Sequence, residues 1–384
     1  MLFKLILKNA FRHKLRTGLT LLGVTIAILA FGLLNTVVRA WYAGADATSS
    51  SRLITRNAIS LVFSMPISYQ QKIRAIPGVT QVSHSNWFGG VYVSERNFFP
   101  QFAVQASTYF QLYPEFVVDE AQMKEFQHDR HGAIVGRKLA ERFGWKVGDT
   151  VPLRGTIWPG NWSFVIRGIY HGAEKTTDEG QFLFHWDYLN ETAKRNYPRR
   201  ANLVGIYVIG IDDPSRTAEV SEAVDATFKN SLAETLTETE KAFQLSFVSM
   251  TEAILLAIQA VSYVVIVIIM AVMANTMAMT ARERLAEYAT LKALGFRPSF
   301  VRLLVYGESM AIALIGGLLG IALTFPAAGA FGKELSNLFP IFYVQTSTLT
   351  TQLLAALVVG LVAAVVPAQR GARINIVEGL RSIA

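Results

Sequence analysis

The stretch RERLAEYATLKALG, residues 282–295, separates two long apolar runs of this chain. The runs cover residues 253–280 and 303–330, and each exceeds the roughly 20 apolar residues that cross a membrane as a helix. The stretch itself is charged, Gly295 is placed to end a helix, and Pro298 prevents much continuation. These features predict a short amphipathic helix at the membrane surface, held between two spans, on which a soluble partner can dock.

We call this predicted element, residues 281–297, the coupling helix. Glu283 lies in its N-terminal half and Lys292 near its end, as the helix dipole favours. Arg282 and Gly295 complete the expected docking element. Four residues at helical spacing are expected to share one face: Arg284, Glu287, Leu291 and Leu294. The alternative is a polar loop that merely reverses the chain, although a plain turn needs only ~2–8 residues.

The composition indicates a membrane protein. Hydrophobic residues make up 52% of the 384 residues, charged residues only 17%, and the mean hydropathy is +0.33. The apolar excess lies in four runs that predict transmembrane helices: Gly18–Val38, Ala253–Thr280, Val305–Ala328 and Leu353–Val366. The last run is short unless its flanking residues are included.

Basic residues set the expected orientation. They cluster before the first span, between the second and third, and after the fourth, whereas the loop 331–349 holds Lys333 alone. The positive-inside rule then places both termini and the coupling helix in the cytoplasm and residues 41–251 outside. We expect a multi-pass protein of the cell inner membrane with a large periplasmic domain. The first apolar run exceeds the core of a signal peptide, so we expect an uncleaved anchor.

The sequence pattern of the external segment predicts an α+β domain. Strand, helix and strand patterns occupy 57–63, 68–75 and 79–85, and again 203–211, 213–232 and 243–248. Two such units predict a split, ferredoxin-like lobe formed by residues 50–100 and 201–250. Residues 101–200 predict a β-rich second lobe inserted between them.

The expected fold class is therefore an α-helical membrane protein with four transmembrane helices, plus a large α+β extracytoplasmic domain between helices 1 and 2. The expected domains are 1–45, a cytoplasmic surface helix and first span; 46–250, the periplasmic domain; and 251–384. The last contains three spans, the coupling helix and a cytoplasmic tail.

The chain lacks recognisable catalytic motifs. A P-loop requires Gly-x4-Gly-Lys-Ser/Thr, and no such sequence occurs. There are no cysteines, and no Gly-x-Ser-x-Gly elbow appears. His128 and His131 have metal-ligand spacing, but no third ligand is evident and a solvated loop is the simpler interpretation. The net charge of +8 is explained by the membrane flanks and dispersed residues, so nucleic acid is not an expected partner.

Three further sets of residues invite a functional interpretation. Gly316 and Gly320 form a GxxxG pair that lets helices approach closely, within the chain or across a dimer. Glu308 is costly in lipid and is expected to face protein or water, or to snorkel towards the membrane surface. Trp158 and Trp162 flank a predicted hairpin tip, where they either contact a partner or substrate or pack beneath the second lobe.

Residues 282–295 resemble the coupling segment of the FtsX-like, MacB-type (type VII) ABC transporter permeases, whose pattern reads like R-E-R-x-R-E-I-G-x-L-K-A-L-G. Glu287 matches the characteristic glutamate, whereas Ala286 replaces a common Arg and Tyr288-Ala289 replaces Ile-Gly. Weaker resemblances to the same family lie in residues 9–23, 132–149 and 367–381.

The resemblance implies a permease that works with a separate ABC ATPase subunit and with a second permease copy, in a homodimer or a pseudo-dimer. ATP and Mg would be bound by the ATPase, so no cofactor is expected in this chain. The implied mechanism is mechanotransmission: ATP hydrolysis moves the periplasmic domain through the spans.

The implied role is export or extraction of a lipid, lipoprotein, peptide or drug-like substrate, with a periplasmic adaptor and an outer-membrane channel. The alternative role is transmembrane signalling, which regulates a cell-wall hydrolase or senses antimicrobial peptides.

Overall fold

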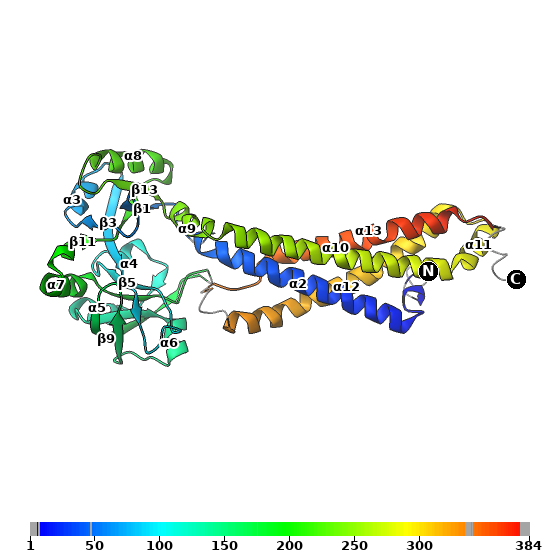
Figure 1. Ribbon diagram of the computed structural model, residues 1–384, viewed down its shortest axis with the longest axis horizontal. Coiled ribbons are helices and arrows are strands. Elements are labelled where there is room, and N and C mark those ends of the chain that lie inside the picture. The colour runs from blue at the N-terminus through cyan, green and yellow to red at the C-terminus, as the bar shows by residue number, and fades with distance from the viewer. Residues whose placement is uncertain are drawn as a thin grey trace. The chain divides into compact units, whose positions relative to one another are not determined.

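Four long apolar helices dominate the computed structural model, which describes residues 6, 8–46, 48–174, 176–334, 339 and 341–376 (Figure 1). They are α2 (Lys14–Asp46), α10 (Glu252–Glu283), α12 (Pro298–Glu334) and α13 (Thr346–Arg373). Each is long and apolar enough to cross a membrane. The four predicted spans are thus confirmed, and the shortest one extends through Pro367 in a continuous helix.

Two compact units divide the chain. One comprises residues 1–40, 251–334 and 342–384, and the other comprises 41–250 with 335–341. In the first unit the four long helices form a bundle, and the short helix α11 (Leu285–Ala293) joins α10 to α12. Of the expected surface helix and C-terminal tail, residues 1–5, 7 and 377–384 lie outside the described part.

The GxxxG pair packs within the bundle. A Cβ on Gly316 would lie 2.9 Å from Val24, and one on Gly320 would lie 2.8 Å from the carbonyl oxygen of Thr25, so both glycines face α2. Thr25 also donates to the Gly316 carbonyl at 3.2 Å. Such close approach is the typical use of small residues in membrane helices. The sequence left open whether the pair serves the chain or a dimer, and the structure assigns it to the chain.

A buried amide joins three of the spans. Gln352 of α13 donates to the Ile28 carbonyl of α2 at 2.8 Å and to Thr324 of α12 at 2.9 Å. A Cβ at position 32 of α2 would lie 1.9 Å from the Gln352 amide nitrogen, so Gly32 makes room for it. Where lipid offers no hydrogen bonds, a polar side chain of this kind must find its partner on a neighbouring helix.

The external unit contains the predicted ferredoxin-like arrangement. Strands β1 (Arg52–Asn57), β3 (Val79–Trp87), β12 (Ile206–Ile211) and β13 (Thr235–Thr239) lie in the order β13-β1-β12-β3, and all neighbours are antiparallel. Helix α3 (Tyr69–Arg74) connects β1 to β3, and α8 (Thr217–Thr227) precedes β13.

Two of the predicted strand positions are wrong. The first strand is 52–57 rather than 57–63, because the Asn57 side chain accepts from the Ile59 amide and turns the chain. The closing strand is β13 rather than 243–248. That stretch lies in helix α9 (Glu240–Ser249), which begins where the Thr239 side chain accepts from the Ala242 amide as an N-cap.

The inserted residues extend the same sheet rather than starting a new one. β3 pairs with β5 (Gln101–Val104), and the order continues through β10 (Phe182–His185), β7 (Gly132–Gly136), β9 (Gly160–Gly172), β8 (Thr150–Gly155) and β4 (Gly90–Val91). The β5–β10 and β7–β9 pairs are parallel, so the sheet is mixed. The remaining elements are β2 (Met65–Pro66), α4 (Tyr109–Leu112), β6 (Phe116–Val117), α5 (Glu120–His128), α6 (Arg137–Phe143), α7 (Trp186–Asn196), η1 (Pro198–Arg200), β11 (Leu203–Val204) and η2 (Pro214–Arg216).

A neutral histidine is buried in this sheet. His84 of β3 is 3% exposed, contacts Gln70 through Nδ1 at 3.1 Å and lies edge-on to Trp186. Its Nε2 has no hydrogen-bond partner among the described residues. Burial disfavours the imidazolium and lowers the pKa of His84 to about 4.

Replacing Gly320 by Ala should destabilise the bundle by about 1–3 kcal/mol, because the new methyl group would press on the α2 backbone. Gly329→Ala in the same helix is the matched control, since nothing lies within 4 Å of its Cβ position. Thermal unfolding of the purified chain in detergent would measure both. Equal melting temperatures for the two variants would contradict the close contact.

His84 should make stability depend on pH. Its folded-state pKa lies below the ordinary value of 6.5, so the unfolded chain binds more protons between pH 6.5 and 4. The His84 contribution is therefore complete above pH 6.5 and is lost as the pH falls towards 4, by about 3 kcal/mol. Denaturant unfolding at pH 7 and pH 5 should show a smaller difference in His84→Gln than in the wild type. An unchanged difference would mean that His84 is not buried neutral.

Candidate functional site

A sharp break separates the span α10 from the short helix α11. Arg284 caps both helices, with φ −105° and ψ 13°, so residues 281–283 continue the span and α11 is shorter than the predicted coupling helix. Gly295 ends α11 at φ +90°, a conformation that glycine adopts readily. Its amide donates to the Lys292 carbonyl, and the Phe296 amide donates to the Leu291 carbonyl, which together form a Schellman cap.

The four residues expected on one face of this helix have different surroundings. Arg284 is buried, Glu287 and Leu291 are half-buried, and Leu294 is 72% exposed. Phe296, which the sequence analysis did not single out, is also exposed and stacks on Phe300. The beginning of the element is therefore held inside the protein, while its end presents apolar side chains outward.

Arg284 holds two carboxylates at the break. Its Nη1 donates to Glu308 Oε1 at 2.5 Å, and its Nε donates to Glu287 Oε2 at 3.0 Å. Glu287 also pairs with Arg12, which lies just before α2. We call Arg12, Arg284, Glu287 and Glu308 the charged cluster. It connects the segment before α2, the start of α11 and the interior of α12.

Two further contacts tie this region together. Arg16 of α2 binds Glu283 of α10 with two hydrogen bonds of 2.8 Å, the bidentate geometry that makes Arg–carboxylate pairs strong. Lys292 of α11 donates to the carbonyl oxygens of residues 372 and 374 at the end of α13. The region around α11 is thereby connected to all four long helices at one end of the bundle.

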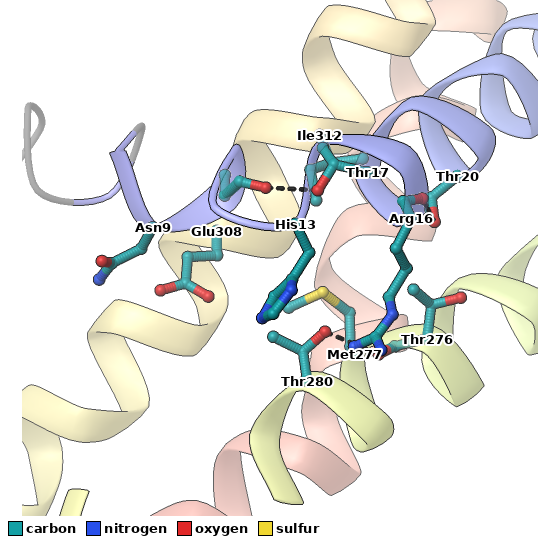
Figure 2. Close-up of a pocket in the computed structure, with 11 residues that line it drawn as sticks. Asn9, His13, Arg16, Thr17, Thr20, Thr276, Met277, Thr280, Glu308 and Ile312 are labelled. Atoms are coloured by element: carbon teal, nitrogen blue, oxygen red, sulfur yellow. Dashed lines mark hydrogen bonds between the residues drawn. The ribbon is translucent and has the colours of Figure 1, made fainter. Parts of the chain in front are cut away.

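A pocket opens beside the charged cluster. Figure 2 shows it between the start of α2, the last turns of α10 and the first half of α12. Arg16 and Glu308 contribute charged side chains to its lining, and His13 contributes an imidazole. Asn9 lies next to the Glu308 carboxylate (Figure 2). The expectation that Glu308 faces protein agrees with its 2% exposure.

The electrostatics favour an ionised Glu287. Partial burial acts to raise the pKa of this carboxyl, but hydrogen bonds from Arg12 and Arg284 outweigh it and leave the pKa below its ordinary value. At neutral pH the side chain is thus an anion shared by two cations. It can keep both contacts only while α11 and the segment before α2 stay together.

A second buried ion cluster lies in the external unit. Arg52, at the start of β1, binds Glu240 at 2.7 Å and Glu115 at 2.6 Å, while Tyr113 donates to Glu240 at 3.0 Å. Burial raises the pKa of Glu240, although Arg52 counteracts it. In the chain, β1 follows the span α2, and α9 precedes the span α10. The Arg52 cluster therefore connects β1 and α9, the two elements next to these spans, to Glu115 of the inserted residues.

Other predicted site residues lie elsewhere. Trp158 and Trp162 are 6% and 3% exposed, and their indole nitrogens donate to the carbonyls of Trp87 and Trp158. Of the two alternatives, the structure has these side chains packed inward, because the hairpin folds back onto the aromatic core. Arg282 is exposed on the last turn of α10. His128 binds the Lys124 carbonyl, and the ring of His131 packs on Tyr188.

The sequence analysis treated Arg12 and Arg16 only as orientation signals. Their spacing from the first span gave no indication of which acidic residues they would meet. Nor did any motif mark Arg52 and Glu240, which lie far apart in the chain. The one available signal was the rarity of charge near apolar runs, which drew attention to Glu308 alone.

Arg284→Met should destabilise the bundle by about 3–5 kcal/mol, because Glu308 would remain buried without its cation. Arg282→Met is the matched control, being exposed and two residues away. Replacing both Arg284 and Glu308 by Met should restore most of the loss, since no unpaired charge remains. Thermal unfolding in detergent measures all three, and equal stability of the two single variants would contradict the buried pair.

Two protein families match the chain. The MacB-like periplasmic core domain family matches residues 17–227, and the FtsX-like permease C-terminal family matches residues 260–376. The first match covers the first span and most of the external unit. The second covers α10 to α13, with the charged break at Arg284.

Three related proteins are described as a permease or as ATP-binding/permease proteins. An uncharacterized ABC transporter permease of Methanocaldococcus jannaschii is 22% identical over 97% of this chain and 96% of its own length. The macrolide export ATP-binding/permease protein MacB of Psychrobacter cryohalolentis is 27% identical over 34% of this chain, but the match spans only 20% of that protein. A probable syringafactin export ATP-binding/permease protein of Pseudomonas syringae is 28% identical over 28% of this chain and 16% of that protein.

Solved structures of similar domains align more distantly. The periplasmic region of MacB from Actinobacillus actinomycetemcomitans aligns over 51% of this chain and 92% of that domain, with 10% identity and a TM-score of 0.37. The extracellular domain of the transporter YknZ from Gram-positive bacteria aligns over 49% of this chain and 100% of that domain, with 12% identity and a TM-score of 0.36.

The family match extends over more than half of the chain, and the four apolar helices with an inserted α+β domain agree with it. The protein is a membrane protein with an extracytoplasmic domain, and it belongs to the MacB-like, FtsX-like family of ABC transporter permeases.

Proposed function

We propose that this chain is the permease subunit of an ABC transporter and couples ATP hydrolysis in a separate ATPase subunit to motion of its periplasmic domain. ATP and Mg are bound by that partner. The observation that carries the proposal is the break at Arg284. There an exposed apolar tip, Leu294 with Phe296, continues directly into a cluster of ion pairs that holds three of the four spans.

The tip is the docking surface in this proposal. Leu294 and Phe296 are exposed on either side of Gly295, whose Schellman cap fixes their position. Neighbouring exposed apolar side chains often mark a site of protein–protein contact. Basic residues cluster before the first span, between the second and third and after the fourth, and this asymmetry supports a cytoplasmic position for the tip and both termini.

The charged cluster is the transmission element. A push on α11 must move Arg284 and Glu287 together, because both belong to the same rigid turn. Arg284 carries the displacement to α12 through Glu308, and Glu287 carries it to α2 through Arg12. Ion pairs of defined geometry transmit such displacements better than an apolar contact, which can slide.

The external unit receives the displacement at the ends of α2 and α10. The Arg52 cluster lies next to both ends in the chain and fixes β1 and α9 to the inserted residues. The moving domain then acts on a substrate outside the membrane. We propose export or extraction of a lipid, lipoprotein, peptide or drug-like molecule, with a second permease copy, a periplasmic adaptor and an outer-membrane channel as further partners.

Different substitutions should abolish binding of the ATPase and transmission of its motion. Leu294→Asp should reduce binding of the ATPase by about tenfold or more, because a carboxylate replaces an apolar contact at the tip. Glu287→Gln should leave the ATPase bound but uncouple its hydrolysis from transport, because the amide cannot pair with two arginines. Co-purification of the ATPase with the tagged permease, and ATP hydrolysis by the purified complex, are the measurements.

Val62→Asp is the matched control for the tip. It changes a residue that is 86% exposed in the external unit, so it should affect neither measurement. Retention of the ATPase by the Leu294 variant would refute the docking surface. Normal coupling in the Glu287 variant would refute transmission through the charged cluster.

A further inference from the structure

Gln352 uses only half of its side-chain amide. Its nitrogen donates to the carbonyl of Ile28 and to the hydroxyl of Thr324. Because a carbonyl can only accept, the amide nitrogen must face Ile28, and the orientation of the amide is fixed. The side-chain oxygen, Oε1, has no hydrogen-bond partner among the described residues, although Gln352 is fully buried. Such an oxygen lowers the stability of the protein unless some group donates to it.

A second unpartnered atom lies one helical turn away on α13. The hydroxyl of Thr348 has no partner within the described part of the chain, and this residue is also fully buried. A threonine in a helix often donates to the carbonyl four residues earlier, as Thr36 does to Gly32 at 2.7 Å. Thr348 lacks this option because α13 begins only two residues before it, so the carbonyl of residue 344 lies outside the helix.

The antiparallel register of α2 and α13 is fixed at two levels. At one level Gln352 meets Gly32, since a Cβ on Gly32 would lie 1.9 Å from the amide nitrogen. At the other level Nη1 of Arg39 lies 3.5 Å from Oε1 of Gln345. Moving outward along α2 therefore corresponds to moving towards the start of α13.

Thr36 and Thr348 lie between these two levels. Each is four residues from the pair formed by Gly32 and Gln352, so the register places the two threonines opposite each other. Thr36 is fully buried, and its oxygen can still accept because its own proton goes to Gly32. Together the three side chains offer one proton, on Thr348, and two acceptors, on Thr36 and Gln352.

We propose that a water molecule binds inside the bundle at this level, donates to Gln352 and Thr36, and accepts from Thr348. A buried water typically makes about three hydrogen bonds of this kind to protein groups that lack other partners. A cation fits less well, because it cannot accept from the Thr348 hydroxyl and because the guanidinium of Arg39 lies on the same side.

The water has a polar route to the extracytoplasmic side. Nε of Arg39 is also buried without a partner in the described residues. Arg39 lies two residues before the external unit, which begins at residue 41. The polar side chains from Gln352 to Gln345 extend over ~10 Å of α13, so further water can lead from the site to Arg39.

The site goes beyond the proposed function and does not depend on it, because the unpartnered groups are present whether or not an ATPase moves the helices. It also makes the two ends of the bundle different. Ion pairs of defined geometry hold the end at α11. At the other end, a bridging water joins α2 to α13, and water can change its partners when one helix shifts against another.

Thr348→Val tests the water by the sign of its effect, because valine keeps the shape of threonine and removes the hydroxyl. If the hydroxyl binds water, the melting temperature of the full-length chain in detergent should fall by about 1–3 °C. Thr350→Val is the matched control, since Thr350 is exposed on the same helix and donates to the Ser347 carbonyl.

An unchanged or higher melting temperature of Thr348→Val would overturn the proposal, because it would mean that valine had replaced an unpaired hydroxyl in a dry site. The choice between Na⁺ and K⁺ in the buffer should have no effect at constant ionic strength. A dependence on the ion that is present in the wild type and lost in Thr348→Val would assign the site to a cation and would equally overturn the water.

Thiol reactivity gives an independent measurement, because the chain contains no cysteine of its own. Thr348 and Val359 are both fully buried on α13, but Val359 belongs to the apolar core of the bundle. Ag⁺, an ion close to water in size, is added to membranes that contain the full-length Thr348→Cys or Val359→Cys variant. It should protect the first cysteine from later maleimide labelling of the unfolded chain at least several-fold faster than the second. Equal rates would refute the hydrated site.

Discussion

Glu308 places a carboxylate inside a bundle of apolar helices, and Arg284 is the cation that neutralises it. Removing Arg284 would leave the buried Glu308 carboxylate without its cation, which is among the most costly events in a folded protein. Arg284 therefore cannot turn outward, and the end of α10 must break there. The break in turn directs α11 across the end of the bundle, where Glu287 meets Arg12 and Lys292 reaches the end of α13.

The remaining contacts between spans obey the same constraint in milder form. The Gln352 side-chain nitrogen and the Thr25 hydroxyl donate to neighbouring helices, and glycines at 32, 316 and 320 make the room that these contacts need. Lipid competes for none of these hydrogen bonds, so each one specifies which helix lies beside which. Within this arrangement α10 remains the least enclosed span, with 22% of its apolar window buried, which leaves its outward face for lipid or a partner.

Much of the fold could be predicted from the sequence. The four spans, the short helix ended by Gly295 and the ferredoxin-like lobe all follow from hydrophobic runs, caps and alternation, and the structure and the family matches confirm them. The strand expected at 243–248 failed because the Thr239 cap starts a helix there, whose contacts with β1 and β13 override its apolar alternation. For Trp158 and Trp162 the sequence left contact and packing both open, and in the structure they pack inward, because a hairpin tip can fold inward as readily as outward.

The sequence by itself determined which segments are apolar enough to leave water and where helices begin and end, because hydrophobicity and capping act between residues close in the chain. Only the tertiary structure decided the pairs: Arg12 with Glu287, Arg284 with Glu308, Gly320 with α2, and Arg52 with Glu240. An ion pair or a glycine contact depends on distances of a few ångströms between residues far apart in sequence. Those distances are set by the packing of whole helices and sheets, and no local pattern contains them.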